Sequence, residues 1–171
     1  NTLAGVVSSM WQRAAASGAP PSGSALRDVV ESIREPRFEM RDGRPVRLGD
    51  CAELNLNAIA KGFVVDAAVR SVAAEFDPAV ILIGAGGDLA QRGEQPSRVA
   101  IENPLRPYDN EWPIAGVELH GRGLATSGGS RRGFRIGDHH YSHVIDPRSG
   151  SPVEHHASIS VLAADAMTAD V

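Results

Sequence analysis

The order of hydrophobic and polar positions in this chain predicts helices first and strands afterwards. Residues 2–16 and 25–33 have helical patterns, and the loop between them, residues 17–24, carries glycines and prolines that break both regular structures. The clearest helix follows Asn57, its expected N-cap, and continues to about residue 75. The apolar positions that align along this helix are Ile59, Phe63 and Ala67, with Val65, Val69 and Val72 beside them.

Short apolar segments predict a sheet in the second half of the chain. Residues 78–84 form an apolar, β-branched run, which is typical of a buried strand. Residues 45–48 are a candidate strand, residues 135–141 resemble a hairpin that turns at Gly137-Asp138, and a last helix is expected to open near Asp165. Further strands, each bounded by Gly, Pro, Asn or Asp, are expected at residues 98–103, 114–120, 123–127, 133–137, 140–146 and 158–163. Helices followed by such a run favour an α+β fold with a largely antiparallel sheet and packed helices.

Composition agrees with one globular domain and excludes some functions. The chain has 171 residues, of which 42% are hydrophobic and 22% charged. Its net charge of −4 and pI of about 5.8 give no electrostatic footprint for nucleic acid, and no apolar run is long enough to span a membrane. The single cysteine, Cys51, excludes an internal disulfide. The chain starts at Asn1 without methionine and stops inside an expected helix, so we expect a piece of a longer protein.

Lys61 is the only lysine, whereas arginine supplies the other 16 of the 17 basic residues. It lies near the start of the long predicted helix, where unpaired N–H groups and the helix dipole favour an anion. Two interpretations stay open. Lys61 is a solvent-exposed charge, as most lysines are, or it is a compact cation for an anionic ligand such as a phosphate. In the second interpretation, Gly62 removes a side chain that would block the ligand.

The glycines of "GAGGD", residues 84–88, follow a predicted strand, where a phosphate loop would lie. No Lys-Ser/Thr pair follows, and residues 89–96 do not continue as a helix, so the P-loop and dinucleotide fingerprints both fail. Either Gly86 and Gly87 form a tight turn with positive φ, or their backbone approaches a ligand with Asp88 exposed at its edge.

The six histidines raise a zinc hypothesis, mainly through "HHYSH" at residues 139–143. On a strand His139 and His143 would face the same side about 13 Å apart, too far to share one tetrahedral ion. His143 is of interest alone, because it precedes an Asp-Pro turn where a strand ends. It is either simply exposed or a general base for a hydroxyl within its reach.

Two aspartates flank the last segment, "ADAMTADV". Asp165 is the expected N-cap of a helix. Asp170 falls inside that helix, where aspartate is a poor helix former, and ligation of Mg²⁺ by its oxygens would explain its presence.

Five blocks of the sequence together resemble the FAD:protein FMN transferases, the ApbE family. "LNLNAIAKGFVVDAAV" is similar to the family's "D-L-x-x-I-A-K-G-Y-x-x-D", and "ILIGAGGDLAQRG" to its "V-x-x-G-G-D-I-x-x-x-G". "LATSGGSRRGF" and "YSHVIDPRSGSPV" resemble its "A-T-S-G-x-x-x-R" and "x-S-H-I-I-D-P-x-T-G-x-P" blocks. "SISVLAADAMTAD" is similar to the stretch that leads into its "A-D-x-x-x-T". The combination is specific, although each block alone is not.

The resemblance implies an ApbE-like (T-fold-like) architecture and an enzyme that cleaves FAD with Mg²⁺. Such enzymes transfer FMN to a Ser or Thr hydroxyl of a target protein as a phosphoester and release AMP. Carried over by position, the implied catalytic residues are His143, which deprotonates the hydroxyl, and Lys61, which lies along the FAD site. The implied flavin-nucleotide residues are Asn55, Gly86, Gly87, Asp88, Thr126, Ser127, Val144 and Ile145. The implied Mg²⁺ ligands are the carbonyl of Ala58 and the side chain of Asp170.

The departures from the family pattern keep alternatives open. The family has Asp where this chain has Asn55, and its metal-binding Thr would fall beyond Val171. We therefore expect residues 1–171 to be a single ApbE-like domain that is partial at both ends. An FAD pyrophosphatase giving FMN and AMP, or a non-catalytic FAD-binding homologue, are the alternatives. Since bacterial members of the family mostly work outside the cytoplasm, often as lipoproteins, the resemblance implies a periplasmic or membrane-anchored protein.

Overall fold

The computed structural model describes residues 4–34, 36–48, 56–108, 110–128, 132–154 and 157–171. The chain divides into two compact units, each described here by itself. The first unit contains Asn1–Asn55 and Arg132–His155, and the second contains Leu56–Arg131 and His156–Val171.

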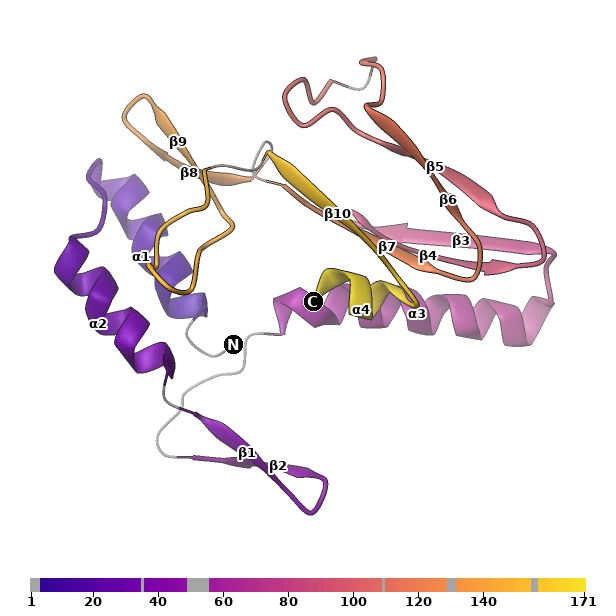
Figure 1. The fold of residues 1–171 in the computed structure, drawn as a ribbon, viewed down its shortest axis with the longest axis horizontal. Coiled ribbons are helices and arrows are strands. Elements are labelled where there is room, and N and C mark those ends of the chain that lie inside the picture. The colour runs from indigo at the N-terminus through magenta and orange to yellow at the C-terminus, as the bar shows by residue number, and fades with distance from the viewer. Residues whose placement is uncertain (1–3, 35, 49–55, 109, 129–131, 155–156) are drawn as a thin grey trace. The chain divides into compact units, whose positions relative to one another are not determined.

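The second unit is built on a four-stranded antiparallel sheet with the strand order β10-β7-β4-β3 (Figure 1). These strands are β3 (Val80–Ala85), β4 (Asp88–Gly93), β7 (Gly123–Gly128) and β10 (Ser158–Ala163). A hairpin of β5 (Ser97–Ile101) and β6 (Ala115–Leu119) and two helices, α3 (Asn57–Phe76) and α4 (Ala166–Asp170), complete the unit.

The two faces of this sheet are covered by different elements. On one face, Val65 and Val69 of α3 pack with Ala166 of α4 and with Ile81 and Ala90 of the sheet. On the other, the buried cluster consists of Ile101 and Leu119 from the hairpin and Leu124 from β7. Figure 1 shows the same arrangement, with α3 and α4 along one side of the sheet and β5 and β6 along the other. The sheet is thus a rigid support between two apolar layers.

The first unit consists of α1 (Ala4–Ser17), α2 (Gly23–Arg34) and two hairpins. The hairpins are β1 (Phe38–Arg41) with β2 (Arg44–Arg47), and β8 (Gly133–Ile136) with β9 (His139–Ser142). Its core joins α1, α2 and β8 through Val7, Trp11, Ala14, Leu26, Phe134 and Ile136. The Trp11 indole N–H donates to the carbonyl of Gly150 at 2.9 Å, which ties the loop after β9 to α1.

The α+β class with an antiparallel sheet is confirmed, and every pairing between the described strands is antiparallel. The hairpin at Gly137-Asp138 is also confirmed, because Ile136 pairs with His139 across it. Two strands, β1 and β4, were not predicted. No helix in the described part of the chain is long and apolar enough to cross a membrane.

The start of α3 and one of its expected apolar positions differ from the sequence prediction. Its N-cap is Leu56, which makes no side-chain cap hydrogen bond, and Asn57 is already helical. Phe63 was expected in the apolar stripe but is 56% exposed. The buried positions are Gly62, Val65, Asp66 and Val69. Val65 and Val69 were also expected among the apolar positions, and their burial is confirmed. Gly62 and Asp66 are buried with them because α3 packs closely on α4 at these two positions.

Candidate functional site

Three charged side chains from three elements meet in the second unit. Lys61 of α3 places its Nζ 2.8 Å from both carboxylate oxygens of Asp88, at the start of β4. The same Nζ lies 3.6 Å from Oδ1 of Asp170, at the end of α4. We call these three residues the Lys61 cluster.

The turn between β3 and β4 brings Asp88 to this position. Gly86 and Gly87 have φ values of 59° and 102°, and Ala85 pairs with Asp88 across them. Both central residues of such a two-residue hairpin need positive φ, which glycine adopts without steric cost. A Cβ on Gly86 would lie 3.8 Å from Cδ of Lys61, so the turn lies directly beside the lysine side chain.

Two carboxylates share one cation in the Lys61 cluster. The side chains of Asp88 and Asp170 are 1% and 7% exposed, whereas that of Lys61 is 39% exposed. Burial raises the pKa of Asp170 above its ordinary value, as does the neighbouring Asp88, while Lys61 acts in the opposite direction. Oδ2 of Asp170 is buried and has no hydrogen-bond partner within the described residues. The cluster therefore offers an unpaired oxygen and an excess of negative charge to a cation, beside a half-exposed ammonium group.

Two details of this arrangement correct the sequence predictions. Asp88 was expected to be exposed at the edge of the glycine turn, but it is buried, because the ion pair with Lys61 compensates its charge. Gly62 was expected to clear a path for a ligand. Instead, a Cβ there would lie 2.6 Å from the Ala166 carbonyl oxygen, so the glycine permits close packing of α3 on α4. The tight turn at Gly86-Gly87 is confirmed.

Several other predicted site residues lie next to the Lys61 cluster. The Thr126 N–H, in β7, bonds the Gly87 carbonyl at 3.0 Å. The Thr126 hydroxyl lies 2.9 Å from that of Ser160, and Ser127 pairs with Ile159 of β10. Ala58 is exposed in the first turn of α3, one turn before Lys61. Within the described ranges, no group of three or more His, Cys, Asp or Glu residues is arranged to hold a metal.

The predicted residues His143, Val144 and Ile145 belong to the first unit, where they follow β9. Partial burial lowers the pKa of His143 from its ordinary value of 6.5, and the nearby Arg132 charge acts in the same direction, although an Arg132 backbone contact opposes it. The Val144 carbonyl accepts from the Val153 N–H at 2.8 Å, and Ile145 bridges to Pro152. These bonds close the base of the loop that follows.

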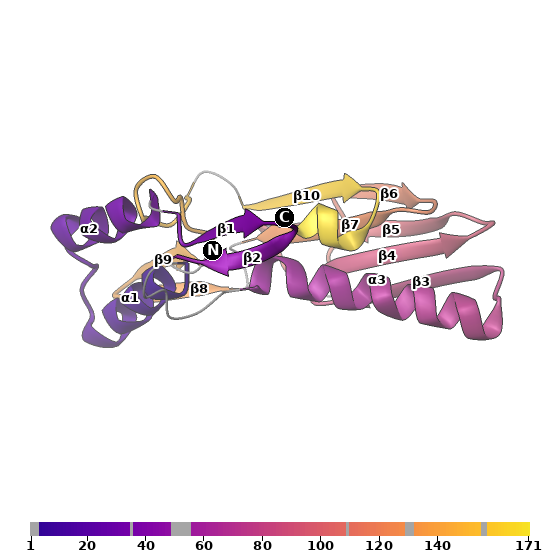
Figure 2. The same cartoon turned by 90° about the horizontal axis from the view of Figure 1, so that it is seen from below.

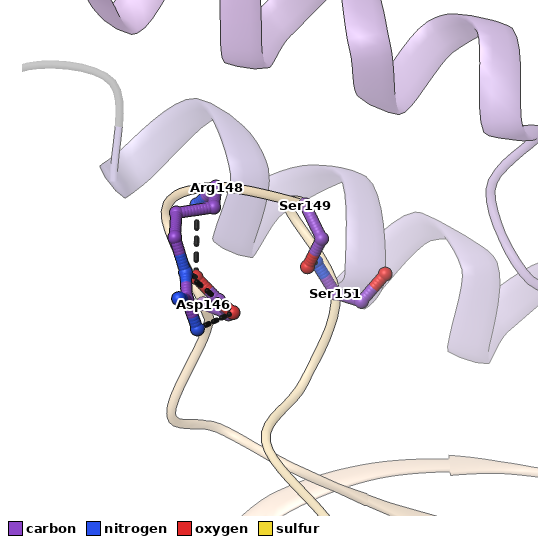
Figure 3. A network of polar contacts seen from close by, with 4 residues as sticks. All are labelled: Asp146, Arg148, Ser149 and Ser151. Atoms are coloured by element: carbon purple, nitrogen blue, oxygen red, sulfur yellow. Dashed lines mark hydrogen bonds and ion pairs between the residues drawn. The ribbon is translucent and has the colours of Figure 1, made fainter.

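That loop is held by its own side chains, as Figure 3 shows. The Asp146 carboxylate accepts from the backbone N–H of Arg148 at 2.9 Å and from its guanidinium at 2.8 Å. The Ser151 N–H contacts the Ser149 hydroxyl at 3.2 Å. Its hydrogen bonds with Arg148 lower the pKa of Asp146, so the carboxylate stays ionised. The backbone after His143 therefore has a defined course. The remaining predicted residue, Asn55, lies outside the described residues.

Sequence reasoning missed Asp66, which is buried on α3. Its two oxygens each accept a backbone N–H of α4, from Ala166 and from Met167, both at 2.9 Å. The available signal was a carboxylate next to Val65 and in line with Val69 on an apolar helix face, where an unpaired charge is costly. Asp165 is confirmed as the N-cap of α4, because its carboxylate accepts from the Thr168 N–H at 2.7 Å.

Curated proteins of known name are similar in sequence to this chain. The curated FAD:protein FMN transferase of Salmonella typhimurium is 37% identical over 123 residues, which cover 68% of this chain and 34% of that protein. The protein of the same name from Rhodobacter capsulatus is 38% identical over 160 residues, 88% of this chain and 30% of its own length. The chain thus spans about a third of the length of these curated relatives.

Solved structures show the same fold. The crystal structure of the ApbE protein from Thermotoga maritima matches with a TM-score of 0.75 and 26% identity, over 88% of this chain and 49% of that one. The flavinyl transferase ApbE of Pseudomonas stutzeri, in its apo form, matches with a TM-score of 0.65 and 30% identity, over 88% and 46% of the two chains. The ApbE family model matches residues 1–171, and the chain therefore belongs to the ApbE family.

Proposed function

We propose that the protein of which this chain is part transfers FMN from FAD to a Ser or Thr hydroxyl of a target protein, with Mg²⁺ and with release of AMP. The Lys61 cluster is the observation that carries this proposal. It places the half-exposed side chain of Lys61, and a buried carboxylate oxygen that has no hydrogen-bond partner among the described residues, beside a glycine turn. Curated relatives named FAD:protein FMN transferase support the same reaction.

The residues of the cluster fit a divalent cation such as Mg²⁺. Mg²⁺ prefers hard oxygen ligands, and Oδ2 of Asp170 is a buried carboxylate oxygen without a hydrogen-bond partner in the part of the chain that the structure describes. Burial and Asp88 raise the pKa of Asp170, so Lys61 compensates the charge of this carboxylate only in part. In this proposal the side chain of Asp170 and the carbonyl of Ala58 hold the ion. When bound, the ion neutralises charge that develops on the diphosphate of FAD.

Lys61 binds the diphosphate in this proposal, and Asp88 orients it. The ammonium group has three N–H donors, and two of them face the Asp88 oxygens at 2.8 Å. Asp170 lies farther from the ammonium, at 3.6 Å, and the Lys61 side chain is 39% exposed, so in this proposal a phosphate oxygen reaches the ammonium from its exposed side. Transfer of this kind depends mainly on positioning and on neutralising charge, which a fixed lysine provides.

His143 accepts the proton of the target hydroxyl in this proposal. The hydroxyl oxygen attacks the phosphorus of the FMN half, the bond from that phosphorus to the bridging oxygen breaks, and AMP leaves with the electron pair. A histidine with a lowered pKa is neutral at physiological pH, so its imidazole is available as a base. The organised loop after His143 gives the histidine a fixed backbone.

The test is to incubate the full-length protein with FAD, Mg²⁺ and a peptide that contains an acceptor Ser or Thr. The proposal predicts a flavin covalently attached to the peptide and one AMP for each attached flavin. Free FMN and AMP without modified peptide would mean that water is the acceptor, as in a pyrophosphatase. FAD binding without AMP release would identify a non-catalytic homologue. Either of these two results contradicts the proposal.

A further inference from the structure

Asp66 connects the two helices that carry the Lys61 cluster. The residue is 8% exposed, and its carboxylate accepts the N–H of Ala166 through Oδ1 and that of Met167 through Oδ2. These are the first two N–H groups of α4, which have no partner inside the helix. The third, Thr168 N–H, is bonded by Asp165 of the same segment. The start of α4 therefore has one local cap and one cap supplied by α3.

The start of α4 also fits tightly against its neighbours. A Cβ on Gly62 of α3 would lie 2.6 Å from the backbone of Met167, and one on Gly123 of β7 would lie 2.1 Å from the Ala166 nitrogen. Figures 1 and 2 both show α4 beside α3. A helix of five residues has no stability of its own, so these contacts determine where α4 lies.

Asp66 and Lys61 contact opposite ends of α4. Asp66 holds its first turn, and Lys61 lies 3.6 Å from Asp170 at its last residue. A displacement at the start of so short a helix moves Asp170 as well. We propose that Asp66 is the positioning residue of the Lys61 cluster, which holds α4 on α3 so that Asp170 faces Lys61 and a divalent cation. The part of this inference that concerns the cation rests on the proposed function.

The chemistry at this position requires a carboxylate. Both oxygens of Asp66 accept from backbone N–H groups at 2.9 Å, so both must be acceptors. In Asp66→Asn one oxygen becomes an NH₂ group, a donor that would face another donor. The substitution preserves the size of the side chain and removes one of the two hydrogen bonds to α4, so it tests these bonds without changing the packing.

The experiment compares Asp66→Asn with Asp165→Ala in the full-length protein. Both variants lose a cap bond of α4, but only the first loses its connection to α3. Binding of Mn²⁺ is measured from the EPR signal of the free ion, and backbone amide exchange is measured at Ala166, Met167 and Thr168. We expect Asp66→Asn to weaken Mn²⁺ binding by about 10–100-fold, as loss of a supporting contact behind a metal ligand does. It should also accelerate exchange at Ala166 and Met167 by about tenfold. Asp165→Ala should change Mn²⁺ binding less than about threefold and affect Thr168 most.

Equal losses of Mn²⁺ binding in the two variants would overturn the proposal, because they would show that Asp66 only stabilises the helix. Unchanged exchange at Ala166 and Met167 in Asp66→Asn would also overturn it. If the wild-type protein binds no Mn²⁺, the proposed metal role fails. The amide exchange at Ala166 and Met167 then tests by itself whether Asp66 holds α4 on α3. If Asp66→Asn does not fold, Asp66→Glu, which keeps both acceptors on a longer side chain, should weaken Mn²⁺ binding severalfold. An unchanged affinity there would contradict the proposal.

Discussion

Lys61 and Asp88 form a two-pronged ion pair, in which the ammonium nitrogen lies 2.8 Å from each carboxylate oxygen. The two residues come from α3 and from the first position of β4, directly after the glycine turn, so the pair fixes that turn against the helix. Lysine suits this position because its compact ammonium lies near two different carboxylates, Asp88 at 2.8 Å and Asp170 at 3.6 Å, whereas the planar fork of arginine matches a single carboxylate. All the other basic residues of the chain, apart from histidine, are arginines, and this geometry gives a physical reason for the one lysine.

Replacing Lys61 should separate its two roles. Lys61→Met leaves the buried Asp88 without its counter-charge, and we expect a loss of about 2–3 kcal/mol in the free energy of unfolding, measured by urea denaturation. The double variant Lys61→Met/Asp88→Asn should recover part of that stability, since Asp88 no longer buries a charge, although Asp170 still lacks its ammonium partner. FMN transfer should stay at least about tenfold below wild type in both variants. Restored activity in the double variant would show that Lys61 is only a structural partner of Asp88.

The ionised carboxylate of Asp170 should destabilise the folded protein in the absence of metal. Burial and Asp88 raise the pKa of Asp170, so the folded state favours the protonated carboxyl. The free energy of unfolding therefore falls as the pH rises from the ordinary pKa of 3.8 through the raised pKa. In metal-free buffer near pH 7, we expect Asp170→Asn to unfold roughly 2–4 °C above wild type, the equivalent of about 1 kcal/mol. The difference should shrink toward pH 3.8.

The same variant should lose its response to metal. Added Mg²⁺ should raise the melting temperature of the wild type and leave that of Asp170→Asn unchanged. Equal responses to Mg²⁺ in the two proteins would show that the ion binds elsewhere.

His143 should determine the acidic limb of the pH–rate profile. Its lowered pKa keeps the imidazole neutral above its ordinary value of 6.5, so kcat/KM should be flat between about pH 7 and pH 8 and fall as the pH drops below 6.5. His143→Gln should reduce the rate by about a hundredfold or more and abolish that limb. A limb that persists in the variant would assign the titration to another group.

Gly62→Ala should be destabilising, although glycine to alanine inside a helix ordinarily stabilises by up to about 1 kcal/mol. The added methyl group would lie 2.6 Å from backbone atoms of α4, which cannot rotate away, and we expect a loss of about 1–3 kcal/mol. Gly116→Ala is the matched control. Its nearest atom would be the flexible Arg98 side chain at 3.8 Å, so the change should stay within about 0.5 kcal/mol. Similar losses in the two variants would contradict the close packing of α3 on α4.

The regular parts of this fold could be predicted because their signals are local. Helix α3 and strand β3 follow from apolar runs of the right length, and the turn at Gly86-Gly87 follows from two glycines that tolerate positive φ. Strand β4 was missed because its residues, Asp88–Gly93, mix polar and small side chains, and its burial comes from pairing with β3 and β7.

The candidate site was predictable in its residue types but not in its contacts. Lys61 and Asp170 stand out in the sequence as a rare residue and as an unfavourable helix residue. The burial of Asp88 and the role of Asp66 depend on residues 27 and 100 positions away in the chain, and no local pattern contains such distances. The packing role of Gly62 likewise requires knowledge of where α4 lies.

In the proposed function, Lys61 and a cation held by Asp170 bind the diphosphate of FAD. A crystal of the full-length protein with FAD and Mn²⁺, measured for anomalous scattering, tests it directly. We expect a Mn²⁺ peak within about 2.3 Å of an Asp170 oxygen and a diphosphate oxygen within hydrogen-bond distance of Lys61 Nζ. A Mn²⁺ peak on other residues, or a diphosphate bound away from Lys61, would contradict it.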